Sequence, residues 1–150
     1  MAKALGSVFE LSIRYLLLLH ISGEKPLTES RLCAEDFICT YAADFGFATE
    51  NLNGNSGYRY GEYAARCSMT NGAIRYLVLH GLIKANADAQ GFTYTITDAG
   101  IEYSSTLNSA YADNYCQLAY MVKEQHEHIT DAELVRHIWV KASTIGREET

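Results

Sequence analysis

The chain has 150 residues, of which 48% are hydrophobic and 20% charged, the composition of a globular protein of about one domain. Twelve lysines and arginines against eighteen acidic residues give a net charge of -6, which opposes nucleic-acid binding driven by overall basicity. The four cysteines form no C-x-x-C pair, and the N-terminal residues show no secretory signal pattern. The longest apolar run, Leu16 to Leu19, is far shorter than the roughly 20 residues of a membrane span. Composition therefore predicts a cytoplasmic protein with reduced thiols and no membrane association.

Apolar residues recur at helical spacing from Val8 to Ile21, and four successive leucines cover most of the circumference of the predicted helix. A helix that is apolar nearly all round is either central in its own core or covered on its second face by another chain. Gly23 and Pro26 then predict a turn.

A second helix is predicted to begin at Thr28 or Ser30 and to end near Gly46. Its Asp36 and Asp44 would lie about 12 Å apart along the axis, too far to share a proton or a metal ion. We interpret both carboxylates as contacts to solvent or to a partner. The apolar stripe of this helix consists of Cys33, Phe37, Ile38, Tyr41 and Phe45.

The segment 46–61 has turn chemistry, with four glycines and four asparagine or serine residues and no periodicity. It predicts a long exposed loop. Tyr58 and Tyr60, with Arg59 between them, favour a contact surface over plain disorder.

The next region predicts a helix-turn-helix followed by a β-hairpin. A short helix is expected over Glu62 to Ser68, and a second helix capped by Thr70 is expected to end at Gly81. Ile74, Leu77 and Val78 would form its buried stripe. Alternating residues then predict strands over 82–86 and 92–96, joined by a turn.

Two helices are predicted to complete the chain. Thr97 caps a long helix that runs toward Glu124, and Thr130 with Glu133 forms a capping box for the last helix. The order of elements predicts a mainly α (α+β) fold: a winged helix-turn-helix domain over residues 1–125, with a two-stranded β-hairpin wing and additional C-terminal helices. Residues 126–150 would be a C-terminal helical extension packed on the same domain.

No motif in the sequence predicts an enzyme, a cofactor or a metal site. His126 and His128 would point about 200° apart on a helix, so we interpret them as solvated histidines at a helix end. Neither a nucleophile signature nor a phosphate-binding motif in its required context is present.

A helix-turn-helix with a wing is a common reader of the DNA major groove, but the charges oppose this use. The outward face of the candidate recognition helix carries Arg75, Tyr76 and Leu79, and the wing adds Lys84, so only two positive charges are available. An exposed aromatic and a leucine beside one arginine favour a protein-binding surface. The candidate partner-binding residues are Tyr58, Arg59, Tyr60, Arg75, Tyr76 and Leu79.

Short motifs over roughly residues 8 to 123 resemble the middle component of ABC-three component systems. Their order and spacing carry the resemblance. They are Glu35-Asp36-Phe37-Ile38, Tyr41, Asp44-Phe45, Gly61-Glu62, Arg66, Gly81-Leu82-Ile83, Gly91, Tyr94, Thr97, Gly100, Tyr111 and Leu118-Ala119.

The resemblance implies a small, non-enzymatic accessory subunit of Lamassu-type bacterial defence complexes. Such a subunit accompanies an SMC-like ATPase and a separate effector, commonly a nuclease, and meets nucleic acid only through the assembled complex. Two other functions stay open: a winged-helix transcriptional regulator that binds DNA by itself, and an antitoxin-like inhibitor or small enzyme with an unrecognised site.

Overall fold

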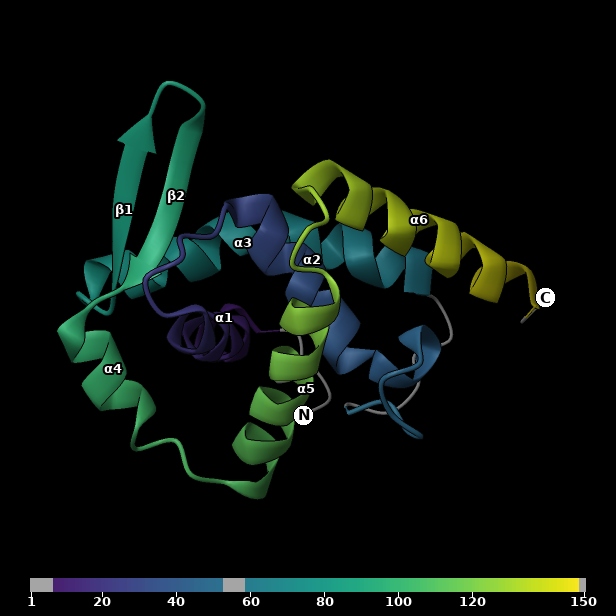
Figure 1. Ribbon diagram of the computed structural model, residues 1–150, viewed down its shortest axis with the longest axis horizontal. Coiled ribbons are helices and arrows are strands. Elements are labelled where there is room, and N and C mark those ends of the chain that lie inside the picture. The colour runs from purple at the N-terminus through teal and green to yellow at the C-terminus, as the bar shows by residue number, and fades with distance from the viewer. Residues whose placement is uncertain (1–6, 53–58, 149–150) are drawn as a thin grey trace.

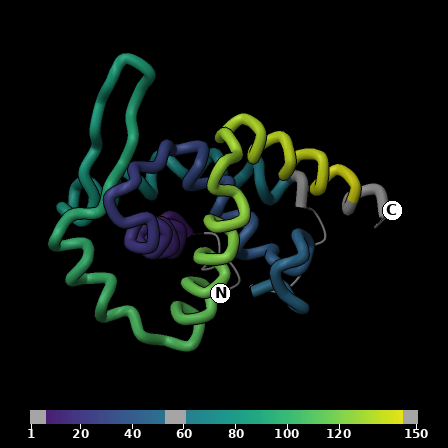
Figure 2. The backbone as a smooth tube through the Cα atoms, viewed as in Figure 1, coloured from purple at the N-terminus to yellow at the C-terminus, as the bar shows by residue number. Residues whose placement is uncertain are grey.

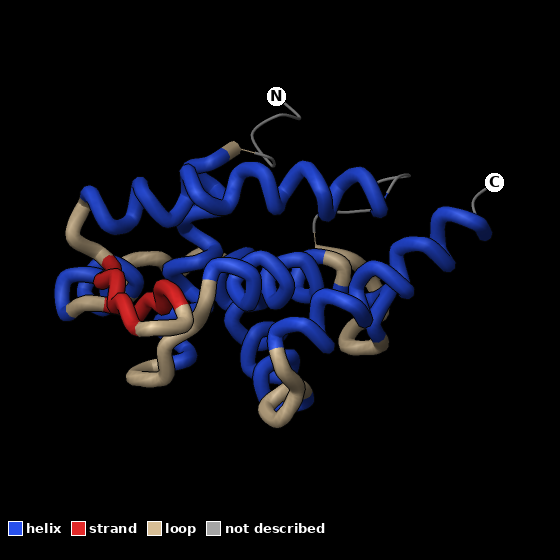
Figure 3. The backbone as a smooth tube through the Cα atoms, turned by 90° about the horizontal axis from the view of Figure 1, so that it is seen from above, coloured by secondary structure: helices blue, strands red, loops and turns tan. Residues whose placement is uncertain are grey.

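Helices make up most of the structure, a computed structural model that describes residues 7–52 and 59–148 (Figure 3). In these ranges one antiparallel hairpin accompanies the helices, as the mainly α (α+β) class predicted. No helix in them is long and apolar enough to cross a membrane. The elements in chain order are α1 (Val8–Ser22), α2 (Glu29–Thr40), the 3-10 helix η2 (Ala42–Phe45), α3 (Arg59–Leu79), β1 (Ile83–Asp88), β2 (Gly91–Ile96), α4 (Asp98–Ser104), α5 (Ala110–Gln125) and α6 (Asp131–Glu148).

Helix α1 lies at the centre of the molecule (Figure 1). The Ser7 side chain caps its first turn by accepting from the Glu10 amide, and Gly23 ends it with a φ of 63°. Residues 16–19 are all buried, because α2, α3, α4, α5 and β2 pack around the helix. The internal interpretation of this apolar helix is therefore confirmed, since elements of the same chain cover it.

Helix α2 begins at Glu29, after the predicted cap Thr28, whose hydroxyl accepts from the Arg31 amide, and it ends at Thr40, earlier than the predicted end near Gly46. After Thr40 the chain continues through η2 to Gly46, which has a φ of 84°. Residues 47–52 form a loop, as predicted, but only Thr49 and Glu50 in it are exposed. Phe47 and Leu52 pack against the core, and the Leu52 amide donates to the Thr40 carbonyl.

Helix α3 is continuous over Arg59–Leu79, so the predicted break before Thr70 is wrong. The Thr70 hydroxyl donates to the Arg66 carbonyl and lies 2.8 Å from the Tyr15 hydroxyl, so this side chain has partners inside the core and caps nothing. Val78, predicted to be buried, is partly exposed.

The predicted hairpin is confirmed, with register from Ile83↔Ile96 to Asp88↔Gly91. A third extended segment joins its base. Leu27, in the connection between α1 and α2, exchanges two backbone hydrogen bonds with Tyr94 at 3.0 and 2.8 Å. The hairpin is therefore attached to the start of α2 as well as to the end of α3.

Two shorter helices replace the long helix predicted after Thr97. Figure 2 shows the chain passing from the hairpin around α1 through α4 and returning as α5. The Ser105 and Thr106 hydroxyls donate to carbonyls three residues back, and Ser109 caps α5 by accepting from the Ala112 amide. Helix α6 packs against α2 and α3, and Thr130 and Glu133 form the predicted capping box at its start.

Candidate functional site

Two features are candidates for function: an ionic network inside the helices and an apolar face at the surface. The network centres on Asp36 of α2, whose side chain is 0% exposed. Its carboxylate accepts from Arg14 Nε at 2.7 Å, Arg66 Nη1 at 3.0 Å and the Tyr115 hydroxyl at 2.6 Å. These donors belong to α1, α3 and α5, so one carboxylate connects α2 to three other helices.

Arg66 extends the network toward the end of α2. It donates to the Thr40 hydroxyl at 2.6 Å and to Glu62 Oε1 at 3.2 Å. Its guanidinium also lies over the rings of Phe37 and Tyr41, at 5.3 and 5.8 Å from their centroids. The side chain is thus held by ionic, polar and aromatic partners together.

The neighbouring Glu35 organises a second cluster on another side of α2. Its carboxylate accepts from Arg31 at 2.8 Å and from Lys123 of α5. Arg31 also donates to the backbone carbonyls of His126 and Ile129, each at 2.7 Å. This second cluster fixes the connection between α5 and α6 onto α2.

These contacts correct two interpretations made from sequence. Asp36 is neither a solvent contact nor a partner contact, because its acceptor oxygens are used inside the core. His126 is buried at the end of α5, where Nδ1 lies 2.8 Å from the Val122 carbonyl, whereas His128 is exposed. The signal in the sequence was Arg14, a charge in the middle of a largely apolar helix, which requires a partner when it is buried.

Burial and charge act in opposite directions on Asp36. Burial by itself would raise the pKa of this carboxyl, but the guanidinium groups of Arg14 and Arg66 hold the pKa below its usual value. Burial lowers the pKa of His126 against the raising effect of its hydrogen bond to the Val122 carbonyl, and the positive charge of Arg31 adds to the lowering. Asp36 is therefore ionised and His126 neutral at pH 7.

The base of the hairpin is fixed by close backbone packing. The Thr97 amide and hydroxyl donate to the Leu82 and Gly81 carbonyls at 3.1 and 2.7 Å, while the hydroxyl also caps α4. Gly100, in the first turn of α4, faces Leu82 so closely that an added Cβ would lie 2.1 Å from its carbonyl oxygen. No larger residue fits there without movement of the backbone.

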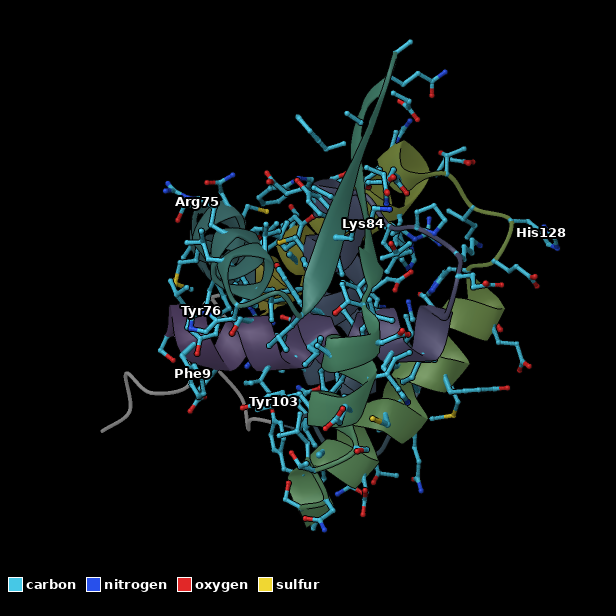
Figure 4. All side chains as sticks on the ribbon, turned by 90° about the vertical axis from the view of Figure 1, so that its left-hand side faces the viewer. Phe9, Arg75, Tyr76, Lys84, Tyr103 and His128 are labelled. Carbon is cyan, nitrogen blue, oxygen red and sulfur yellow. The ribbon has the colours of Figure 1, made fainter. Side chains whose placement is uncertain are left out.

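The apolar face lies where the start of α1 meets the end of α3. We define it by Phe9, Tyr76 and Leu79, which are supported by an aromatic contact of 5.7 Å between Phe9 and Tyr76. Leu79 is 78% exposed and Phe9 is 50% exposed. Tyr76, predicted to be exposed, is half-buried, because it packs against the core and its ring stacks on His80. Figure 4 shows Phe9, Tyr76 and the exposed Arg75 along one edge of the molecule, with Lys84 on the hairpin beside them.

The structure brings together only part of the predicted binding set. Arg75, Tyr76 and Leu79 share the end of α3, and Phe9 is an additional member that was not among the predicted binding residues. Tyr58 lies outside the described residues. Arg59 and Tyr60 begin α3, but their side chains also lie outside the described part.

The sequence profile of the ABC-three component (ABC-3C) system Middle Component 2 matches residues 4–148. The chain belongs to this family. Comparisons with curated proteins and with solved structures gave no match.

Membership gives the ionic network a clear interpretation. Residues that carried the resemblance to ABC-three component middle components, including Asp36, Tyr41, Glu62 and Arg66, contact one another inside the fold. Gly81, Thr97 and Gly100 meet at the base of the hairpin. In this family member these motif residues hold the helices and the hairpin together, and the exposed apolar face lies apart from them.

Proposed function

We propose that this chain is a non-catalytic accessory and regulatory subunit of a bacterial anti-phage and anti-plasmid defence complex of the Lamassu type. It bridges an SMC-like ATPase and a nuclease-type effector in the cytoplasm through protein contacts. It uses no cofactor, and it meets nucleic acid only through the assembled complex. Membership in the Middle Component 2 family supports a role inside a multi-component system.

The observation that carries the proposal is the apolar face of Phe9, Tyr76 and Leu79. Clustered exposed aromatic and aliphatic side chains beside an arginine are typical of the centre of protein interfaces. The Tyr15 hydroxyl and Thr70 hydroxyl join α1 to α3 behind this face, so it is presented on a fixed pair of helices. Binding of a partner to this face therefore loses little conformational entropy, because few side chains and little backbone must become ordered.

We further infer that the domain is a winged helix. The order α1, extended Leu27, α2, α3 and hairpin, with Leu27 paired to β2, supports this topology. Regulation of the effector requires two arrangements of the bound complex. The ATPase must favour one of them, because a partner shifts the equilibrium between two states only by the difference between its affinities for them.

The same topology keeps a DNA-binding regulator as the second candidate. Arg75 on α3 and Lys84 on β1 of the hairpin are exposed (Figure 4). Two charges and a chain of net charge -6 supply few of the 6–10 or so phosphate contacts on which strong salt-dependent DNA affinity rests. The charge balance therefore favours the protein-binding role.

Co-expression with the neighbouring genes tests the proposal. The tagged chain is expected to co-purify the ATPase and effector, and Tyr76→Ala combined with Leu79→Ala is expected to abolish co-purification while leaving the helical circular dichroism signal unchanged. Co-purification that persists in the double variant would show that this face does not bind the partners. Nanomolar, site-selective binding of duplex DNA by the isolated chain at two salt concentrations would favour the regulator instead.

A further inference from the structure

Two cysteines that are distant in the sequence meet between α2 and α3. The sulfur atoms of Cys33 and Cys67 lie 3.3 Å apart, and both side chains are free thiols. Cys33 is buried in the core, whereas Cys67 is exposed on the outer side of α3. One member of the pair can thus meet a small solute, and the other is held directly behind it.

The distance permits a covalent bond with little movement. A disulfide requires an S–S separation of about 2.0 Å, so the two sulfurs must approach by about 1.3 Å. Helices α2 and α3 pack directly on each other, and rotation of the exposed Cys67 side chain supplies such an approach. The Asp36–Arg66 ion pair holds the two helices in register. Asp36 is three residues from Cys33, and Arg66 is next to Cys67.

We propose that Cys33 and Cys67 form a reversible intramolecular disulfide when the protein meets a hydroperoxide. Cys67 is the residue that reacts with the oxidant, and Cys33 is the residue that closes the bond. The product would connect α2 to α3 covalently through the interior of the fold.

The surroundings of Cys67 favour its role as the reactive thiol. A hydrogen bond from Cys33, a second from the Tyr63 hydroxyl and the positive charge of Arg66 lower the pKa of Cys67 to about 7. The pKa of Cys33 is raised, because its hydrogen bond to Cys67 and its burial favour the thiol form. A large fraction of Cys67 is therefore thiolate at pH 7, while Cys33 keeps its proton.

The reaction balances in two steps. The Cys67 thiolate attacks the terminal oxygen of the hydroperoxide, the O–O bond breaks, and Cys67 becomes a sulfenic acid, while the leaving oxygen takes a proton from solvent and departs as water from hydrogen peroxide or as an alcohol from an organic hydroperoxide. The Cys33 sulfur then attacks the Cys67 sulfur, the S–O bond breaks, and the departing hydroxide takes the Cys33 proton to form water. The peroxide gains the two electrons that the two thiols lose together.

Peroxide treatment of the purified, reduced full-length chain tests the proposal. Non-reducing peptide mapping is expected to show a Cys33–Cys67 disulfide, 2 Da lighter than the dithiol, that a small thiol reductant reverses. In Cys33→Ala, and in Cys33→Ser, which keeps a polar group at the site, the sulfenic acid has no partner. Labelling of Cys67 by dimedone should therefore rise at least roughly 5-fold over the unsubstituted chain. Cys116→Ser, a substitution of a thiol on α5, should leave the disulfide yield unchanged.

Two results would overturn the proposal. One is equal dimedone labelling of Cys67 with and without Cys33. The other is oxidation that links Cys67 to Cys116 or to a second molecule. The serine and alanine variants are compared by their circular dichroism spectra, so that a labelling difference is read only from folded protein.

Discussion

Asp36 and Arg66 form an ion pair of 3.0 Å that solvent does not reach, and it joins α2 to α3. The adjacent Glu35 pairs with Arg31 and Lys123 on another side of the same helix. Two successive acidic residues thus tie α2 to α1, α3, α5 and the turn before α6. A sequence pattern would place these charged side chains at the surface. In this protein they connect the helices inside the fold.

Asp36→Asn is expected to lower the free energy of unfolding by about 3–5 kcal/mol, because it removes the buried counter-charge of Arg14 and leaves Arg66 only the partly exposed Glu62. The matched change Asp113→Asn, at an exposed position in the first turn of α5, should cost less than about 1 kcal/mol. Urea denaturation followed by circular dichroism measures both. Equal stability of the two variants would contradict the role given to Asp36.

The lowered pKa of His126 predicts a pH dependence of stability. In the unfolded chain this imidazole takes up a proton near its usual pKa of about 6.5, whereas the folded chain resists protonation, so stability falls as the pH drops below that value. The loss of stability between pH 7.5 and 5.5 should be smaller in His126→Asn than in the unsubstituted chain. His128→Asn, two residues away and exposed, should keep the original pH dependence. If the free energy of unfolding depends on pH equally in all three proteins, His126 is not a buried neutral histidine.

Gly100→Ala is expected to destabilise the protein by about 1–3 kcal/mol, because the new methyl group would press on the Leu82 carbonyl at the base of the hairpin. Gly72→Ala is the matched control. Its Cβ would lie 3.6 Å from the Val8 side chain, an ordinary contact, so this helix position should gain about 0.5–1 kcal/mol. The melting temperatures of the two variants should shift in opposite directions. A decrease or an increase in both would show that the close approach at Gly100 is relieved easily.

Local chemistry made several elements predictable from sequence. Thr28 as a cap, the hairpin with its turn and the Thr130 capping box depend on side chains within a few residues of one another. The continuity of α3 through Thr70 did not follow from local chemistry, because the Tyr15 partner of that hydroxyl lies 55 residues away.

The candidate site was predictable in part for the same reason. Helical spacing places Arg75, Tyr76 and Leu79 on one outward face of α3. The exposure of Phe9 depends instead on where α3 ends beside α1, and this is set by the tertiary structure. The burial of Asp36 likewise depends on three helices that meet only in the folded chain.

The account rests on the claim that this chain acts by binding another protein through the apolar face. Calorimetric titration of the purified chain with its co-purified partner subunit tests the claim most directly. Leu79→Asp is expected to weaken binding at least roughly 10-fold, whereas Phe92→Asp, a comparably exposed apolar position on the hairpin, should change it less than about 2-fold. Unchanged affinity of Leu79→Asp for the partner subunit would contradict the account.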